Sequence, residues 1–560
     1  MVAPNIGNNE HERYVFVADE VVFQVLHPPV TDLESAAAIR ARIIAAIVNF
    51  LRPGGIEIGV RLPENDWRNR LAPPTANSRI VTFSSLTQLE GSERFSLIPI
   101  KLIRPDPESL TQDDVINLLK DIYTDLGDSF IVPGGGGDDD NDERGKDDKD
   151  EDEKEKDDEK RKDDDDRKDD DKDKRDRFRS IPLDDTGEIR LKSISPNWLA
   201  SDLHHGGATG GPGSLPASKA APPNNRPGFQ LEGTINSLSN YRRPGAQIAI
   251  LDTIQPATFP ADIQAIFSAN PGMNTVPYIY PDLAPLAAYA QLPHHYQMPD
   301  HGTFIASIIR AIVPSAQVHL YEVLNSYGVG CFISIAQGVV DAVNQRGSNT
   351  PALILSCSFM LDDNLQDLDI EMEILKQKNI HNLLRTSMRD VFNWATTTSN
   401  LNVVVVASAG NDSSQGNRKD ARYPASFYEV VSVAALPKNY PKSNGKYRPS
   451  SYSNRAHSRE PNKGNAYSIA TFGGEMLSGS SPKDGVLGVY IGEIPTQNTN
   501  GTFSQTPPAN STNWAEWSGT SFAAPIITSL LAMPTIPQVT PSSDPYLTTD
   551  NEHVIRVQQG

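Results

Sequence analysis

The sequence predicts an α/β fold in which a mostly parallel sheet carries helices on both faces. Two observations in the second half of the chain support this prediction. Short apolar runs rich in β-branched residues occur at 247–251, 318–324, 352–356, 403–407 and 430–434. Segments with helical spacing separate most of these runs, at 301–312, 331–346, 384–399 and 521–532. Apolar strands that alternate with helices are typical of a parallel sheet buried on both sides.

A smaller α/β region is expected at residues 1–133. Strand-like segments rich in β-branched and aromatic residues lie at 13–17, 21–26, 80–83 and 95–103. Residues 33–51 carry Ala, Ile and Leu at helical spacing, and two glycines follow them, which predicts a helix and its end. A second helix is expected to begin near Thr111. Its apolar face would consist of Val115, Ile116, Leu118, Leu119 and Ile122.

An acidic low-complexity segment at 134–178 interrupts this region. Residues 138–177 contain 24 Asp or Glu and 14 Lys or Arg, so forty residues hold half of the chain's net charge of −20. Such a composition cannot bury enough apolar surface to offset the entropy of ordering, which predicts disorder. We interpret the segment as a solvated linker. Weak divalent-cation binding, a processing site or contact with a basic partner stay open as alternatives.

The remaining boundaries follow from changes in composition. Residues 179–204 are expected to supply the terminal strand of the N-terminal region, formed by 186–194 and ended by 195–199. Residues 205–232 are rich in Gly and Pro, which predicts an exposed linker of the kind that proteases cut. Residues 233–545 then form the main domain. Residues 546–560 are interpreted as a C-terminal tail.

Several classes of function are disfavoured by the composition. The chain has no basic face for nucleic acid, and no apolar run approaches the ~20 residues that span a membrane. Its two cysteines, Cys331 and Cys357, lie in apolar runs and are expected to be buried free thiols. The polar N-terminus does not resemble a signal peptide. We therefore expect a cytoplasmic protein, and secretion stays open.

Four polar residues lie where an α/β sheet places its chemistry. Asp252 and Asn411 follow predicted strands, whereas His301 and Ser521 open predicted helices. The start of a helix leaves backbone N–H groups free and carries positive potential, so a serine there can be aimed at a carbonyl group. Acyl transfer also needs a base and an acid that orients the base. Each residue alone has an ordinary structural reading as a helix cap or turn residue.

The order and local sequences of these residues resemble the subtilisin-like peptidases, or subtilases. Asp, His and Ser occur in that family's order. Residues 300–306 read DHGTFIA, residues 519–525 read GTSFAAP, and residues 407–412 read ASAGND. Residues 423–433 and 452–454 are also similar to later segments of the family. The resemblance covers about 245–535.

The resemblance implies a role for each of these residues. Ser521 would be the nucleophile, His301 the general base and Asp252 the acid that orients it. Asn411 and the Ser521 backbone N–H would form the oxyanion hole, and Ser358 would contact the substrate. The implied activity is that of a serine endopeptidase acting on polypeptides. It requires no cofactor, and a calcium ion is compatible with it as a structural ion.

This sequence also departs from the family's pattern in two places. Ile254 replaces a glycine that usually follows the acid by two residues, which implies a different path for the next loop. Phe359 and Met360 replace smaller residues and are expected to reshape the specificity pocket. A catalytically silent peptide-binding or scaffold protein with this fold is therefore the alternative hypothesis.

Residues 95–199 resemble the end of a subtilase prodomain, with the acidic run inserted as a loop. The implication is a zymogen that processes itself, with its maturation site in the Gly/Pro-rich linker. A permanent accessory domain is the alternative. Residues 1–94 belong either to this prodomain or to a separate module, and the sequence does not decide between the two.

Overall fold

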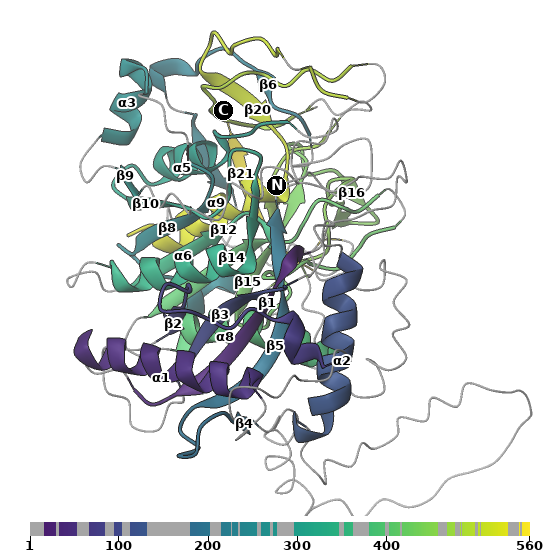
Figure 1. Cartoon of the computed structure of the whole chain (residues 1–560). Coiled ribbons are helices and arrows are strands. Elements are labelled where there is room, and N and C mark those ends of the chain that lie inside the picture. Colours follow the sequence, from purple (N-terminus) through teal and green to yellow (C-terminus); the bar gives the residue numbers. More distant parts are fainter. Residues whose placement is uncertain are drawn as a thin grey trace, which may run out of the picture.

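The computed structural model describes most of both predicted regions (Figure 1). The described residues are 16–29, 33–52, 66–83, 94–103, 112–130, 180–201, 214–225, 227–232, 236–254, 259–268, 273–276, 296–346, 352–361, 380–397, 402–414, 417–456, 468–476, 482, 484–498, 502–504, 506–535, 548 and 552–559. The acidic segment at 134–178 lies outside them, so its predicted disorder stays a prediction.

The main domain is built on a nine-stranded sheet in which eight neighbouring strands are parallel. Its spatial order is β7 (Phe229–Glu232), β21 (His553–Gln559), β18 (Ser468–Phe472), β15 (Val430–Leu436), β14 (Val403–Ser408), β12 (Leu353–Cys357), β8 (Gln247–Asp252), β10 (Gln317–Glu322) and β9 (Met273–Val276). Only β7 is antiparallel, and it pairs with β21. The central strands β8, β12 and β14 are buried along their whole length, as their continuous apolar sequences predicted.

Helices cover both faces of this sheet. They are α3 (Ala261–Ser268), α5 (His301–Ile312), α6 (Phe332–Asn344), α8 (Ile380–Thr397) and α9 (Thr520–Ala532). Helices α5 and α9 pack against each other and against the sheet, and α6 and α8 form a second such pair (Figure 1). Every residue of α9 is buried, so this helix lies within the core rather than on its surface. The predicted fold class is confirmed.

The N-terminal region adds an antiparallel sheet. Its strands run in the order β11 (Val329–Cys331), β5 (Arg190–Ser201), β1 (Phe16–His27), β3 (Arg94–Lys101) and β2 (Val81–Phe83), while β4 (Ile181–Pro182) and β13 (Met360–Leu361) also pair with β5. Helices α1 (Leu33–Leu51) and α2 (Gln112–Phe130) belong to the same region. All five apolar residues predicted for the face of the second helix are buried. The antiparallel sheet packs against α6 and α8 of the main domain.

Strand β5 departs from the prediction. The segment 195–199 was expected to end the strand, but the strand continues through Pro196 to Ser201. Pairing explains the difference, because β1 lies opposite β5 as far as Trp198. Beyond that point β11 and β13, which are strands of the main domain, pair with β5 from either side. Partners distant in the sequence therefore extend a strand whose local sequence signals an end.

Further strand pairings in the main domain were not predicted from the sequence. Part of the Gly/Pro-rich stretch forms β6 (Ala217–Ser218), which pairs with β20 (Trp514–Trp517), and β20 pairs in turn with β19 (Val486–Val489). A separate hairpin consists of β16 (Lys442–Ser443) and β17 (Lys446–Tyr447). Within the segment interpreted as a C-terminal tail, residues 553–559 form β21, a member of the main sheet.

Two compositional expectations can be compared with the described residues. Cys331 and Cys357 are both buried free thiols, as expected, and burial raises the pKa of each. Among the helices that the structure describes, none combines the length and apolar character needed to cross a membrane.

Candidate active site

Asp252 and His301 are brought together at the edge of the main sheet. Asp252 is the last residue of β8, and His301 is the first residue of α5. The imidazole Nδ1 lies 2.8 Å from the Asp252 carboxylate Oδ1, and both side chains are completely buried. A carboxylate on Nδ1 favours the tautomer or charge state that carries a proton there, and it stabilises an imidazolium. This geometry suits a general base.

The approach of β8 to α5 depends on Thr253 and Gly302. The Thr253 hydroxyl donates to the Pro299 carbonyl at 3.0 Å and accepts the Gly302 N–H at 3.1 Å. A Cβ atom at position 302 would lie 2.3 Å from the Thr253 carbonyl oxygen, which only glycine avoids. The contribution of Thr253 to the site was not predicted from the sequence. Its position directly after Asp252 was the signal that could have indicated it.

Aromatic side chains enclose the imidazole. The His301 ring lies 5.4 Å from the Trp517 ring in an edge-on arrangement and 5.5 Å from the Phe522 ring, measured between centroids. Phe304, one turn along α5, contacts the same two aromatic rings. These contacts fix the ring plane and exclude water, which strengthens the electrostatic interaction with Asp252.

Ser521 lies in the first turn of α9, beside this aromatic cluster. It is 2% exposed, and its neighbour Phe522 contacts the His301 ring. The Ser521 hydroxyl donates to the carbonyl oxygen of Ser358 at 3.3 Å, while the Ser358 hydroxyl donates to the Ser521 carbonyl at 3.0 Å. The described contacts thus join Ser521 to Ser358 and not to the imidazole. Hydrogen bonds between catalytic groups often form only when substrate is present.

Asn411 faces the start of α9 from the loop after β14. Its side-chain Oδ1 accepts hydrogen bonds from the Thr520 backbone N–H and the Thr520 hydroxyl, both at 2.9 Å. Because Oδ1 accepts both bonds, the amide Nδ2 remains as the group that can donate to an oxyanion. Asn411 is therefore bonded to the residue that directly precedes Ser521, and these bonds fix the orientation of the Asn411 amide.

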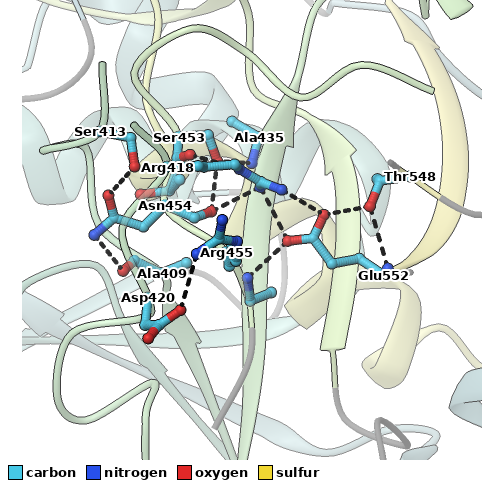
Figure 2. A network of polar contacts seen from close by, with 12 residues as sticks. Ala409, Ser413, Arg418, Asp420, Ala435, Ser453, Asn454, Arg455, Thr548 and Glu552 are labelled. Atoms are coloured by element: carbon cyan, nitrogen blue, oxygen red, sulfur yellow. Dashed lines mark hydrogen bonds and ion pairs between the residues drawn. The ribbon is translucent and has the colours of Figure 1, made fainter. Parts of the chain in front are cut away.

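The loop that carries Asn411 has a constrained backbone. Gly410 has a φ of +109°, a region that favours glycine, and a Cβ atom there would lie 2.6 Å from the side-chain Nδ2 of Asn454. On the other side, Asp412 is buried. Burial opposes its ionisation, but Arg422, Asn454 and Lys419 outweigh burial and lower the pKa of Asp412. The charged form of Asp412 is therefore favoured, and its bonds to Arg422 and Asn454 anchor the loop next to Asn411. Figure 2 shows the bonds of Asn454 to Ala409 and Ser413 in the same loop.

The end of strand β5 pairs with two short strands of the main domain. Ala200 pairs with Leu361 and Gly330, and Ser201 pairs with Met360 and Val329. Met360, predicted to reshape the specificity pocket, is thus a pairing partner of the chain's own strand.

The described chain resumes at Ser214, close to the candidate nucleophile. The Trp517 indole donates to the Ser214 carbonyl at 2.7 Å, and Ser214 and Ser518 exchange two further hydrogen bonds at 3.0 Å. Ser201 and Ser214 are therefore both held close to the candidate site, and residues 202–213 lie outside the described part of the chain.

A metal centre finds no support in the described residues. No group of three or more His, Cys, Asp or Glu side chains among them could hold an ion. The arrangement of Asp252, His301 and Ser521 offers a base, an orienting acid and a hydroxyl, which are the groups that acyl transfer requires.

Comparison with protein families agrees with this chemistry. Residues 290–547 match the subtilase family, Peptidase S8, so the chain carries a subtilase-family domain. The matched segment contains His301, Asn411 and Ser521 and begins after Asp252. Proteases of this family act on polypeptides.

Solved structures also show similarity. A lanthipeptide protease is 20% identical, with 52% of this chain and 72% of that chain covered and a TM-score of 0.31. Sphericase is 19% identical over 52% and 76%, with a TM-score of 0.28. The epidermin leader peptide processing serine protease of Staphylococcus aureus is 15% identical over 61% and 75%, with a TM-score of 0.33. A search among curated proteins found no match.

Proposed function

We propose that this chain is a serine endopeptidase that hydrolyses peptide bonds through Asp252, His301 and Ser521. The observation that carries the proposal is the buried 2.8 Å contact between Asp252 and His301, with Ser521 on the helix packed against α5. A buried carboxylate bonded to an imidazole Nδ1 needs a reason, because burying a charge is costly. Stabilising a transient imidazolium supplies that reason.

The proposed reaction proceeds in two halves. The Ser521 hydroxyl leaves its bond to Ser358, gives its proton to His301 Nε2 and attacks the carbonyl carbon of the substrate. The negative charge on the substrate oxygen is stabilised by Asn411 Nδ2 and by backbone N–H at the start of α9. The His301 imidazolium then protonates the leaving amine, and an ester of Ser521 remains. Water, deprotonated by the same imidazole, hydrolyses this ester and restores the free enzyme.

Strand β5 is proposed to inhibit the site before maturation. Its residues Ala200 and Ser201 pair on both sides with main-domain strands, as an extended substrate would. The register pairs Leu361 with Ala200 and Met360 with Ser201. The maturation site is proposed to follow Ser201, in the Gly/Pro-rich linker at 205–232.

The first testable prediction concerns self-processing. Expressed wild-type protein is expected to yield a peptidase fragment that begins within the linker at 205–232, whereas the Ser521→Ala variant stays uncut. N-terminal sequencing and intact mass measure this directly. A fluorophosphonate probe is expected to label the cut wild type at Ser521 and to leave the variant unlabelled.

The outcomes separate the competing interpretations. A probe-reactive protein that is cut elsewhere would retain the peptidase and refute the proposed maturation site. Failure of the probe to react even after the 202–213 segment is cleaved by an added protease would refute the peptidase. It would favour the silent peptide-binding alternative. Cleavage that persists in Ser521→Ala would assign the cut to another enzyme.

A further inference from the structure

The segment that carries Asn411 is bonded on both sides of Asn411 to one buried residue, Asn454. Its Nδ2 donates to the Ala409 carbonyl at 3.3 Å and to the Asp412 carboxylate, and its Oδ1 accepts the Ser413 hydroxyl at 2.7 Å. The Asn454 backbone N–H also donates to the Gly410 carbonyl at 3.0 Å. Residues on both sides of Asn411 are thus bonded to a single residue, so a shift of Asn454 moves the candidate oxyanion donor.

Asn454 is in turn held by the guanidinium of Arg418. Nε donates to the Ser453 carbonyl and Nη2 donates to the Asn454 carbonyl, each at 2.9 Å (Figure 2). The Arg418 side chain is only 14% exposed. Two adjacent carbonyl groups are therefore fixed by one rigid fork of donors, a geometry that lysine cannot reproduce.

Glu552, from the C-terminal segment, holds the other side of the same guanidinium. Its Oε1 accepts Arg418 Nη2 at 2.9 Å, and its Oε2 accepts Nη1 at 3.1 Å, in a bidentate arrangement (Figure 2). Oε1 also accepts the Ala456 N–H at 2.7 Å, and Oε2 accepts the Thr548 hydroxyl at 2.6 Å. Glu552 is completely buried. Four hydrogen bonds therefore converge on one carboxylate, at the residue immediately before β21.

We propose that Arg418 and Glu552 are positioning residues for the oxyanion donor Asn411, and that the C-terminal segment fixes the geometry of the catalytic site. The chain of contacts runs from Glu552 through Arg418 and Asn454 to the loop at 409–413. This inference rests on the proposed function, because it concerns the same oxyanion hole. It assigns a catalytic consequence to residues that touch neither substrate nor nucleophile.

A conservative substitution of Glu552 or Arg418 cannot preserve the hydrogen bonds between the two side chains. Both carboxylate oxygens of Glu552 accept from Arg418, so in Glu552→Gln either orientation of the amide turns its NH2 toward a guanidinium nitrogen. The guanidinium must then shift, and its bonds to the Ser453 and Asn454 carbonyls shift with it. In Arg418→Lys a single ammonium replaces the fork and cannot span all four acceptors.

The second prediction concerns the self-processed protein obtained by expressing the full chain with Glu552→Gln. We expect kcat to fall about tenfold with KM nearly unchanged, because an oxyanion donor acts in the transition state and not on bound substrate. Glu232→Gln is the matched control. It breaks the 2.6 Å ion pair with Arg556 on the same C-terminal strand, and that pair does not contact the Asn411 loop. We expect the control to keep wild-type kcat.

A double-mutant comparison separates positioning from general weakening of the fold. In an Asn411→Ala background the donor is already absent, so Glu552→Gln is expected to lower kcat no further. If Glu552→Gln costs as much in that background as in wild type, the pair acts on stability alone and the inference is wrong. Arg418→Lys serves as the second variant where Glu552→Gln folds poorly, with the same expected outcome.

Hydrogen exchange tests the inference without relying on activity. Peptides covering 403–414 are expected to exchange faster in Glu552→Gln than in wild type and in Glu232→Gln. Unchanged exchange in this segment would refute the positioning role even if the protein is an active peptidase. Faster exchange in a protein that the fluorophosphonate probe never labels would instead retain the structural link and refute the peptidase.

Discussion

At the scale of single residues, charge is buried around His301 and each buried group has a distinct environment. Asp252 is bonded to the imidazole, whereas Asp300, one residue earlier in the chain than His301, faces away from this pair. Asp300 Oδ2 accepts the Gly492 N–H at 2.5 Å, and its Oδ1 is buried with no partner among the described residues. Burial raises the pKa of Asp300 to about 6, although the N–H groups of Gly492 and Ile491 oppose this shift.

The third prediction follows from this carboxyl group. Its pKa is higher in the folded state than the ordinary value of 3.8, so the folded protein binds the proton more tightly. The contribution to stability is fully present below about pH 4 and is lost as pH rises through about 6. Asp300→Asn keeps an acceptor for Gly492 and should be more stable than wild type at pH 8, by about 1–3 kcal/mol.

Urea unfolding at pH 4 and pH 8 measures this difference. The advantage of Asp300→Asn is expected at pH 8 and should shrink or disappear at pH 4. A difference between variant and wild type that is the same at both pH values would show that the carboxyl group does not titrate in this range. Asp262→Asn, in the exposed first turn of α3, is the control.

At the scale of secondary-structure elements, the site depends on the close approach of a strand end to a helix start. The β8 strand delivers Asp252, the α5 helix delivers His301, and Gly302 allows the backbones to meet. The α9 helix delivers Ser521 and is buried throughout, which leaves its first turn little freedom to move. The distance between the acid and the base is therefore set by packing of whole elements.

The fourth prediction tests that approach with Gly302→Ala. The new methyl group would meet the Thr253 carbonyl oxygen at 2.3 Å and must push β8 away from α5. We expect a loss of about 1–3 kcal/mol of stability, as for other overpacked sites, together with a lower kcat. Gly228→Ala is the control, because a Cβ atom there has no atom within 4 Å. Thermal unfolding and peptidase assays give the two readouts, and wild-type values for both would contradict the prediction.

At the scale of the whole molecule, the N-terminal region is joined to the main domain by polar contacts around β5. Lys192 forms an ion pair with Asp390 at 2.8 Å, and the Ser195 and Ser387 hydroxyls lie 3.0 Å apart. Asn197 Oδ1 accepts the Ile333 N–H at the start of α6, at 3.2 Å. These contacts hold the strand whose end pairs with β11 and β13 of the main domain.

The fifth prediction concerns this interface. Asn197→Ala leaves the Ile333 N–H without its side-chain acceptor, a loss comparable to that of a helix cap, or about 1 kcal/mol. After self-cleavage, the N-terminal fragment carrying Asn197→Ala should therefore inhibit about fivefold more weakly. Titration of the peptidase with wild-type and variant fragments measures the inhibition constant. Thr124→Ala on the exposed side of α2 is the control, and equal inhibition by all three fragments would contradict the prediction.

Part of the structure follows from short-range patterns in the sequence. The helix expected at 33–51 has those bounds, as does the helix at 301–312, and each of the five predicted apolar runs overlaps a strand of the main sheet. Hydrophobic periodicity is a local property, so it identifies amphipathic helices and buried strands directly. The residue types at Asp252, His301, Asn411 and Ser521 likewise indicated the chemistry before any fold was known.

Tertiary structure decided what depends on partners far apart in the chain. Local sequence gave no sign that β5 continues past Pro196, that residues 217–218 join β20, or that β21 completes the main sheet. The bond from Ser521 to Ser358 and the ion pair of Arg418 with Glu552 were equally hidden. Strand pairing and buried ion pairs are settled by which surfaces meet after folding, and no local pattern encodes that choice.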